Sequence, residues 1–218
     1  MTLPIKHSIV TALLLSAIIL GGFATAAKAN MVQDHMNHIT ESWTDTPEEK
    51  GLLPIAIAEA EIAVLHARVA ANQTHDLVWM QKHTRHVLHA IDPSVVDDGP
   101  GYGYGVLRAA QGIAKQITLA AQQDDASENV KTHAVHVATS ANNTIARVAR
   151  IKVLINQILA ADNAEQAAPV VIELEEATHQ LLDGFDANGD GEITWEAGEG
   201  GLNECAKHMA IMRAGEGV

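Results

Sequence analysis

Oxygen-bearing side chains alternate along one short stretch near the C-terminus and lead into a glycine. Asp186, Asn188 and Asp190 are each separated by a single residue, and Gly191 follows directly. Ca²⁺ takes about six to eight oxygen ligands, so a short segment that binds it must curl until alternate side chains point to one centre. Gly191 can adopt the positive φ that such a turn requires. The spacing therefore predicts a calcium-binding loop.

The stretch resembles an EF-hand, because Ile193 occupies the apolar position after the turn and helix-like sequence flanks the loop, over about residues 169–213. The resemblance implies a single helix-loop-helix and a calcium ion held by three side chains, a peptide carbonyl, and a hydroxyl that binds directly or through a water. These ligands are Asp186, Asn188, Asp190, the carbonyl of Glu192, and Thr194. No second loop of this kind exists in the chain, so this one is expected to lean on the rest of the protein or on another molecule.

The stretch departs from the EF-hand pattern at its last ligand. The family has a bidentate acid at the twelfth position of the loop, where this chain has Ala197. Glu196 and Glu199 are the nearest acids, and either can close the site if the glycine-rich run 198–201 bends the chain. Water can also fill the position. The alternative is an ordinary turn rich in Asp, Asn and Gly that binds nothing.

The histidines are the second set of candidate ligands. All 12 except His7 lie beyond residue 29, and imidazole is a common ligand for zinc, copper and haem iron. Because three-residue steps spread His83, His86 and His89 over about 120° of one helix, that helix alone is not expected to supply three ligands. A site with one residue from each of three helices is expected instead. Its candidates are His66, His83 or His86, and His133 or His136. The alternative is a set of core-edge or surface histidines satisfied by neighbours or water.

The elements that must position these residues are helices. The chain is rich in alanine and only 3% aromatic, which suits close-packed helices better than strands. Apolar residues recur at steps of three and four, the period of a helix. Helices are expected from Thr46, with a kink near Gly51 and Pro54, and over residues 75–91, 106–122 and 125–161. A further helix should begin at Pro169, and a short one should contain Leu202 and Met212. The predicted fold is an all-α antiparallel bundle with a single C-terminal EF-hand-like helix-loop-helix.

The first 29 residues are typical of an export signal. Lys6 and His7 precede an apolar run, and Ala27 and Ala29 are the small residues that a signal peptidase reads. Cleavage is expected after Ala29, which would leave a periplasmic or secreted protein without a membrane span. Residues 30–46 are predicted to be a flexible arm. Its His/Met cluster is a candidate copper contact: Met31, Asp34, His35, Met36 and His38.

Charge and cysteine content exclude several functions. Residues 162–218 carry 13 acidic residues against Lys207 and Arg213, which attracts cations and argues against nucleic acid as a partner. The lone Cys205 excludes an internal disulfide, a multi-thiolate metal site and covalent haem attachment. No serine or cysteine nucleophile motif and no His-Glu-x-x-His pattern is present.

The sequence thus predicts four parts: a signal (1–29), an arm (30–46), a histidine-rich bundle (47–162) and a calcium-binding unit (163–218). The expected function is calcium binding by an exported sensor, buffer or structural module, with a protein partner or a second copy of the chain as a possible contact. One alternative is a bundle that binds copper, zinc or haem through its histidines, with calcium as a structural lock. A metalloenzyme has less support.

Overall fold

The computed structural model describes residues 30–218, whose regular secondary structure is helical apart from one isolated β-bridge between Gly184 and Gly200. It confirms the all-α bundle. The expected signal sequence and its cleavage after Ala29 lie outside the described residues. The helices are α1 (Met31–Thr40), α2 (Leu52–Ala71), α3 (Leu77–Ile91), α4 (Val106–Ala121), α5 (Glu128–Ala160), α6 (Ala164–Leu182) and α7 (Leu202–Glu216).

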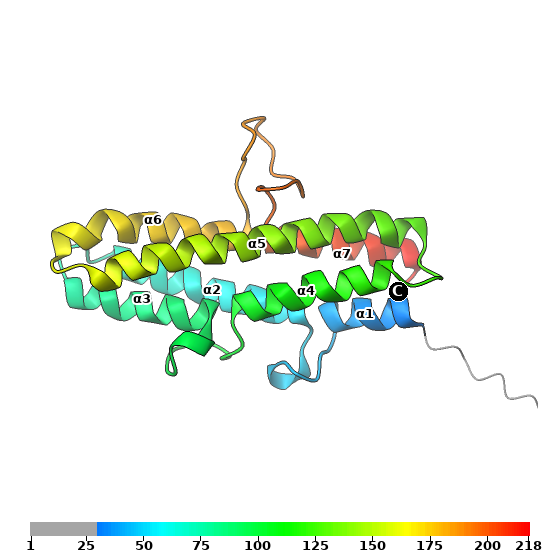
Figure 1. Cartoon of the computed structure of the whole chain (residues 1–218), viewed down its shortest axis with the longest axis horizontal. Coiled ribbons are helices and arrows are strands. Elements are labelled where there is room, and N and C mark those ends of the chain that lie inside the picture. Colours follow the sequence, from blue (N-terminus) through cyan, green and yellow to red (C-terminus); the bar gives the residue numbers. More distant parts are fainter. Residues whose placement is uncertain (1–29) are drawn as a thin grey trace, which may run out of the picture.

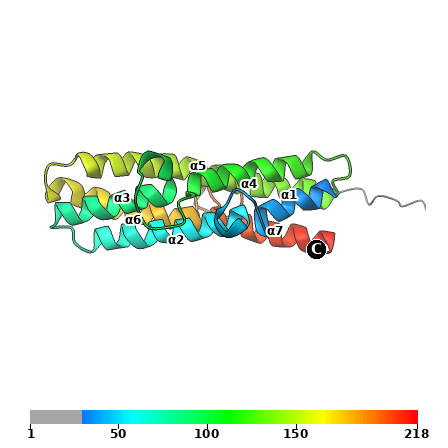
Figure 2. The same cartoon turned by 90° about the horizontal axis from the view of Figure 1, so that it is seen from below.

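The bundle is elongated, and its one unbroken rod is α5 (Figure 1). With 33 residues, α5 is about 50 Å long at 1.5 Å per residue. It packs against α4, α6 and α7 and, over a smaller area, against α3. Helices α6 and α7 lie end to end along α5, and the segments that interrupt the other rods project away from the bundle (Figures 1 and 2). The long helix thus forms a common support for both halves of the molecule.

Where a projecting segment separates two consecutive helices of the bundle, the second helix begins directly after a glycine. The residues that cap α2, α4 and α7 are Gly51, Gly105 and Gly201. A β-carbon at Gly201 would lie 2.5 Å from the Leu182 carbonyl oxygen, and one at Gly51 would lie 2.6 Å from the Thr40 carbonyl carbon. Only glycine lets the end of one helix approach the start of the next so closely. The projecting segments therefore leave and return to nearly the same place.

One hydrophobic core runs through the described helices and crosses the predicted division at residue 162/163. Val171, Leu174 and Leu181 of α6 belong to the same core cluster as the residues of α2 and α5. The alanines of α2 let neighbouring helices approach closely: Ala56, Ala60, Ala63, Ala67 and Ala70 are all 0% exposed. The C-terminal helices are thus part of the bundle and not an appended module.

The flexible arm predicted for residues 30–46 is wrong over Met31–Thr40, which is a helix packed on the core. Residues Met31–Thr40 form α1, whose Val32, Met36 and Ile39 are buried at steps of four and three. Asn30 caps this helix by accepting a hydrogen bond from the Gln33 backbone N–H at 3.1 Å. The sequence contained this apolar spacing, but the polar residues between obscured it.

Helix ends followed the predictions closely in the middle of the chain and less well elsewhere. α3, α4 and α5 begin and end within about three residues of the predicted bounds. Thr46 does not start a long helix, because Pro47–Glu49 form only a 3₁₀ turn and Thr46 makes no side-chain cap. Pro169 does not open α6, which begins at Ala164 after the Asn163 cap. Among residues 30–218, none of the helices combines the length and the apolar character that a membrane span requires.

Candidate metal centres

Three histidines converge between α2 and α3. His66 of α2 places its Nδ1 atom 3.0 Å from Nδ1 of His83 and 3.3 Å from Nδ1 of His86. The last two residues are three positions apart on α3, so they lie on neighbouring parts of the same helix face. His83 is buried and the other two are partly buried. We call this group the first cluster.

A second group repeats this arrangement between α5 and α7. His208 of α7 places Nδ1 at 3.1 Å from Nδ1 of His133 and at 3.3 Å from Nδ1 of His136. His133 and His136 are again three positions apart, here on α5, and the residue of the other helix again lies closest to both. His208 is buried and the pair on α5 is partly buried. We call this group the second cluster.

The spacing of the ring nitrogens matches that of ligands around a small ion. Zinc–imidazole bonds of about 2.0–2.1 Å place two ligand nitrogens about 3.3 Å apart at a tetrahedral angle. In both clusters the three ligand atoms lie within 4.8 Å of one another. Among the described residues, only these two groups bring at least three His, Cys, Asp or Glu ligand atoms together in this way. Each cluster can therefore hold one metal ion.

The environment keeps five of these six imidazoles neutral near pH 7. The pKa of His66 and that of His208 are lowered to about 4, first by burial and then by the other histidines of the same cluster. Burial also lowers the pKa of His83, His86 and His136. A neutral imidazole offers a nitrogen lone pair, whereas an imidazolium offers none. These residues can therefore bind a cation without first losing a proton.

A tryptophan ring covers one histidine of each cluster. The ring of Trp79 lies 4.4 Å from that of His83, and its Nε1–H donates to the Val69 carbonyl oxygen at 2.8 Å. The ring of Trp195 stacks on that of His136 at 4.0 Å. These flat apolar surfaces shield the clusters from water and fix the orientation of the imidazoles.

The outer nitrogens of the two buried histidines differ in their surroundings. Nε2 of His83 and Nε2 of His208 are both buried without a hydrogen-bond partner. Glu204 nevertheless places Oε2 at 3.5 Å from Nε2 of His208. A carboxylate beside the outer nitrogen of a metal-binding histidine makes the ring a better ligand. The second cluster has such a group within reach.

The single three-helix site predicted from the sequence is wrong. His66 joins both His83 and His86, while His133 and His136 belong to the other cluster. Sequence reasoning missed His208, although it lies on the buried face of α7. The pattern that could have identified His208 is its position three residues after Cys205 and four before Met212, which places all three on one face of a helix. His89 takes no part, because its Nδ1 faces the Pro100 carbonyl oxygen at 3.1 Å.

The predicted calcium loop lies in the segment that projects between α6 and α7 (Figure 1). The Asp186 carboxylate accepts hydrogen bonds from the backbone N–H groups of Gly189, Asp190 and Gly191 at 2.6, 3.2 and 2.8 Å. These bonds, with that from Gly191 as the largest cause, lower the pKa of Asp186. Asn188 Oδ1 accepts from the Asp190 N–H at 2.9 Å. The segment is therefore tightly curled around Asp186.

The two acids that could close the calcium loop, Glu196 and Glu199, differ in burial and in hydrogen bonding. Glu199 is 1% exposed, and its Oε2 accepts from the backbone N–H and the hydroxyl of Thr194 at 2.9 and 2.7 Å. Glu196 and Glu192 are exposed. The helix after the loop begins only at Leu202. Glu199 thus ties the end of the loop to its base.

Two residues of α5 hold the base of this loop. Arg147 donates to the carbonyl oxygens of Gly198 at 2.7 Å and Gly200 at 2.9 Å, and also to that of Glu199. Asn143 accepts from the Gly198 N–H at 2.8 Å. Burial lowers the pKa of the Arg147 guanidinium to about 10. The loop is therefore fastened to α5, the helix that also carries His133 and His136.

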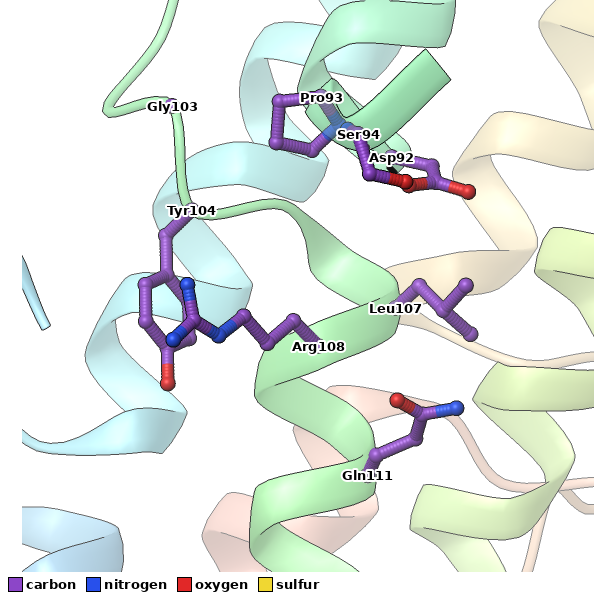
Figure 3. A pocket seen from close by; sticks show the side chains of 8 residues that line it. All are labelled: Asp92, Pro93, Ser94, Gly103, Tyr104, Leu107, Arg108 and Gln111. Carbon is purple, nitrogen blue, oxygen red and sulfur yellow. Dashed lines mark hydrogen bonds between the residues drawn. The ribbon is translucent and has the colours of Figure 1, made fainter. Parts of the chain in front are cut away.

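A separate cavity of about 390 Å³ lies between the 92–105 segment and α4 (Figure 3). The guanidinium of Arg108 lies over the Tyr104 ring, 4.5 Å from its centre, and pairs with Asp45 at 2.6 Å. Asp92 pairs with Lys152 at 2.7 Å. None of the described residues that line this cavity is a histidine, so it is distinct from both clusters.

The two clusters have to be interpreted from their own geometry. No protein-family model, curated protein or solved structure matches this chain. Each cluster unites a His-x-x-His pair of one helix with a single histidine of another helix. The described residues thus carry two histidine groups that can each hold a metal ion.

Proposed function

We propose that this protein binds transition-metal ions, one at each histidine cluster. The observation that carries the proposal is the convergence of three Nδ1 atoms in each group, at 3.0 and 3.3 Å around His66 and at 3.1 and 3.3 Å around His208. A metal-free arrangement gains little from three imidazole nitrogens that face one another, because a hydrogen bond needs one donor and one acceptor. A cation satisfies all three lone pairs at once.

The ligand set favours copper or zinc. Imidazole nitrogen suits both metals, whereas calcium and magnesium prefer oxygen. Cys205 cannot add a thiolate, because burial raises the pKa of its thiol to about 12. Three nitrogens that converge on one point suit a bare ion better than haem, whose iron takes at most two axial ligands. We propose metal handling outside the cytoplasm, in keeping with the signal-like residues 1–29.

Metal analysis of the untagged protein tests this proposal. The expected result is two equivalents of bound copper or zinc per chain after dialysis. His66→Ala and His208→Ala should each remove one of the two equivalents retained through dialysis, and the double variant should retain neither. His75→Ala is the matched control, since His75 is exposed and belongs to neither cluster. A wild-type chain that binds neither metal at micromolar concentration would contradict the proposal.

A second proposal is calcium binding by the loop that starts at Asp186. It is supported by the three consecutive backbone N–H groups that donate to the Asp186 carboxylate, because this curls the chain around the alternating oxygen donors. The acidity of the C-terminal quarter raises the local cation concentration. Asn188 and Asp190 are the other side-chain ligands, with the Glu192 carbonyl and Thr194 next to them.

Calcium titration followed by Trp195 fluorescence tests this second proposal. Trp195 lies in the loop and stacks on His136, so a rearranged loop changes its emission. Calcium should also raise the melting temperature, because it binds the folded loop better than the unfolded chain. Asp186→Ala should abolish both effects, whereas Asp162→Ala, outside the loop, should preserve them. No response of the wild-type protein to millimolar calcium would overturn the proposal.

A further inference from the structure

A third pair of histidines has the same sequence spacing as the pairs in the two clusters. His35 and His38 lie three positions apart on α1, and α4 supplies the facing residue, Gln116. Gln116 places Oε1 at 2.7 Å from Nδ1 of His35 and at 3.3 Å from Nδ1 of His38. Its side chain is well enclosed, since Gln116 is only 6% exposed. Two imidazoles and one amide oxygen therefore converge between α1 and α4.

The three groups share one geometry. In each group, one side-chain atom of a residue from a second helix lies 2.7–3.1 Å from Nδ1 of the first histidine of a His-x-x-His pair. The same atom lies 3.3 Å from Nδ1 of the second histidine. That residue is His66 in the first cluster, His208 in the second and Gln116 here. The third group thus has the shape of the others, with an oxygen where they have a nitrogen.

The tryptophans extend the correspondence. The chain has three tryptophans, and each contacts a histidine of a different group. Trp43 lies 4.5 Å from the His38 ring, as Trp79 lies 4.4 Å from that of His83 and Trp195 4.0 Å from that of His136. Trp43 comes from the segment after α1 and not from the helix itself. Three such pairings from three different backbone settings point to a common role.

We propose that His35, His38 and Gln116 form a third metal site, which takes a divalent copper or zinc ion more weakly than the two clusters do. The proposal rests on the proposed metal binding of those clusters. An amide oxygen is a harder and weaker ligand than imidazole, which disfavours monovalent copper and suits a divalent ion. The orientation of the Gln116 amide, with oxygen toward both nitrogens, also presents the ligating atom to the ion.

The test uses the full chain with both clusters silenced by His66→Ala and His208→Ala. Titration with Cu²⁺ should show one remaining equivalent, weaker than those of the wild-type protein. Adding Gln116→Ala should abolish it. Adding Gln116→His should instead tighten it by roughly tenfold or more, a scale typical of changes around a metal site. Gln111→His is the control, because Gln111 lies on the same helix and is exposed; it should leave the affinity unchanged.

The outcomes separate this inference from the proposal beneath it. A wild-type protein that binds no metal would remove both. A wild-type protein that binds two equivalents, with none left in the silenced variant and no gain from Gln116→His, would overturn the third site alone. Far-ultraviolet circular dichroism should show unchanged helicity in each variant. A variant that loses helicity is replaced by Gln116→Leu, which keeps the side-chain volume and should equally abolish binding.

Discussion

Replacing Arg147 with methionine should detach the projecting loop and lower the stability of the protein. Arg147 is 7% exposed, and its guanidinium donates to three successive carbonyl oxygens at the base of the loop. Methionine keeps much of the apolar stem but has no donor. Because α5 also carries His136, on which Trp195 stacks, the change should loosen the cover of the second cluster as well.

The size of the effect follows from what each carbonyl retains. Gly200 still accepts from Asn143 Nδ2 at 3.3 Å, and Glu199 still accepts from the Phe185 N–H at 3.3 Å. Only the Gly198 oxygen loses the donor that it has here. Because Gly198 is exposed, water can replace that donor and no buried group is orphaned. Each hydrogen bond to the charged guanidinium contributes about 1.5–3 kcal/mol. Methionine carries no charge that must be buried, and this offsets part of the cost. Arg147→Met is therefore expected to lower the free energy of unfolding by about 3 kcal/mol.

Urea unfolding followed by circular dichroism measures the free energy of unfolding, and acrylamide quenching measures the exposure of Trp195. Both measurements are best made with Trp43→Phe and Trp79→Phe, so that Trp195 is the single emitter. Arg150→Met is the control, since Arg150 is an exposed partner of Glu173 and should cost less than about 0.5 kcal/mol. A loss below about 1 kcal/mol for Arg147→Met, with unchanged quenching, would refute the reasoning.

Three further predictions concern pH, a buried glutamate and metal removal. In the metal-free protein the free energy of unfolding should fall as pH falls from about 6.5 toward 4. Burial lowers the pKa of His66 and His208 to about 4, so the unfolded chain takes up protons at a higher pH than the folded one. The urea concentrations at the midpoint of unfolding, measured at pH 7, 5.5 and 4.5, test this. A midpoint that does not change with pH would contradict it. Glu59→Ala should cost about 2–4 kcal/mol in thermal unfolding, because Glu59 accepts from the backbone N–H groups of Tyr104 and Gly105 and is 0% exposed. Zinc at 100 times its dissociation constant should stabilise the protein by about 2.7 kcal/mol per site, and a chelator should reverse this; a melting temperature that is the same with and without zinc would contradict it.

The helices could be predicted because their signal is local. The three-four spacing of apolar residues is present in the sequence whatever lies opposite, and it located α3, α4 and α5 well. It failed for α1 because the apolar residues there, Val32, Met36 and Ile39, are few and are separated by polar residues. It also gave no sign that α6 and α7 share the core of the bundle.

The clusters could be predicted only in part, because each needs a residue from a second helix. The periodicity showed that His83, His86 and His89 cannot meet at one point, and the structure agrees, since His89 turns to the Pro100 carbonyl. It could not show that His66 completes a site with the first two. Which helix faces which is decided by the packing of the whole chain, and no spacing within one helix records it.

The two clusters differ in how far apart along the chain they draw their ligands, and this affects how strongly an ion would stabilise the fold. His66 and His83 are 17 residues apart, whereas His133 and His208 are 75 apart. An unfolded chain that used the same ligands would have to close these loops, and the longer one costs about 1.3 kcal/mol more. Since stabilisation depends on how much better the folded chain binds than the unfolded one, equal ligation would stabilise the fold more at the second cluster. That ion would also fasten α7, the last helix, to α5, the rod that supports both halves of the bundle.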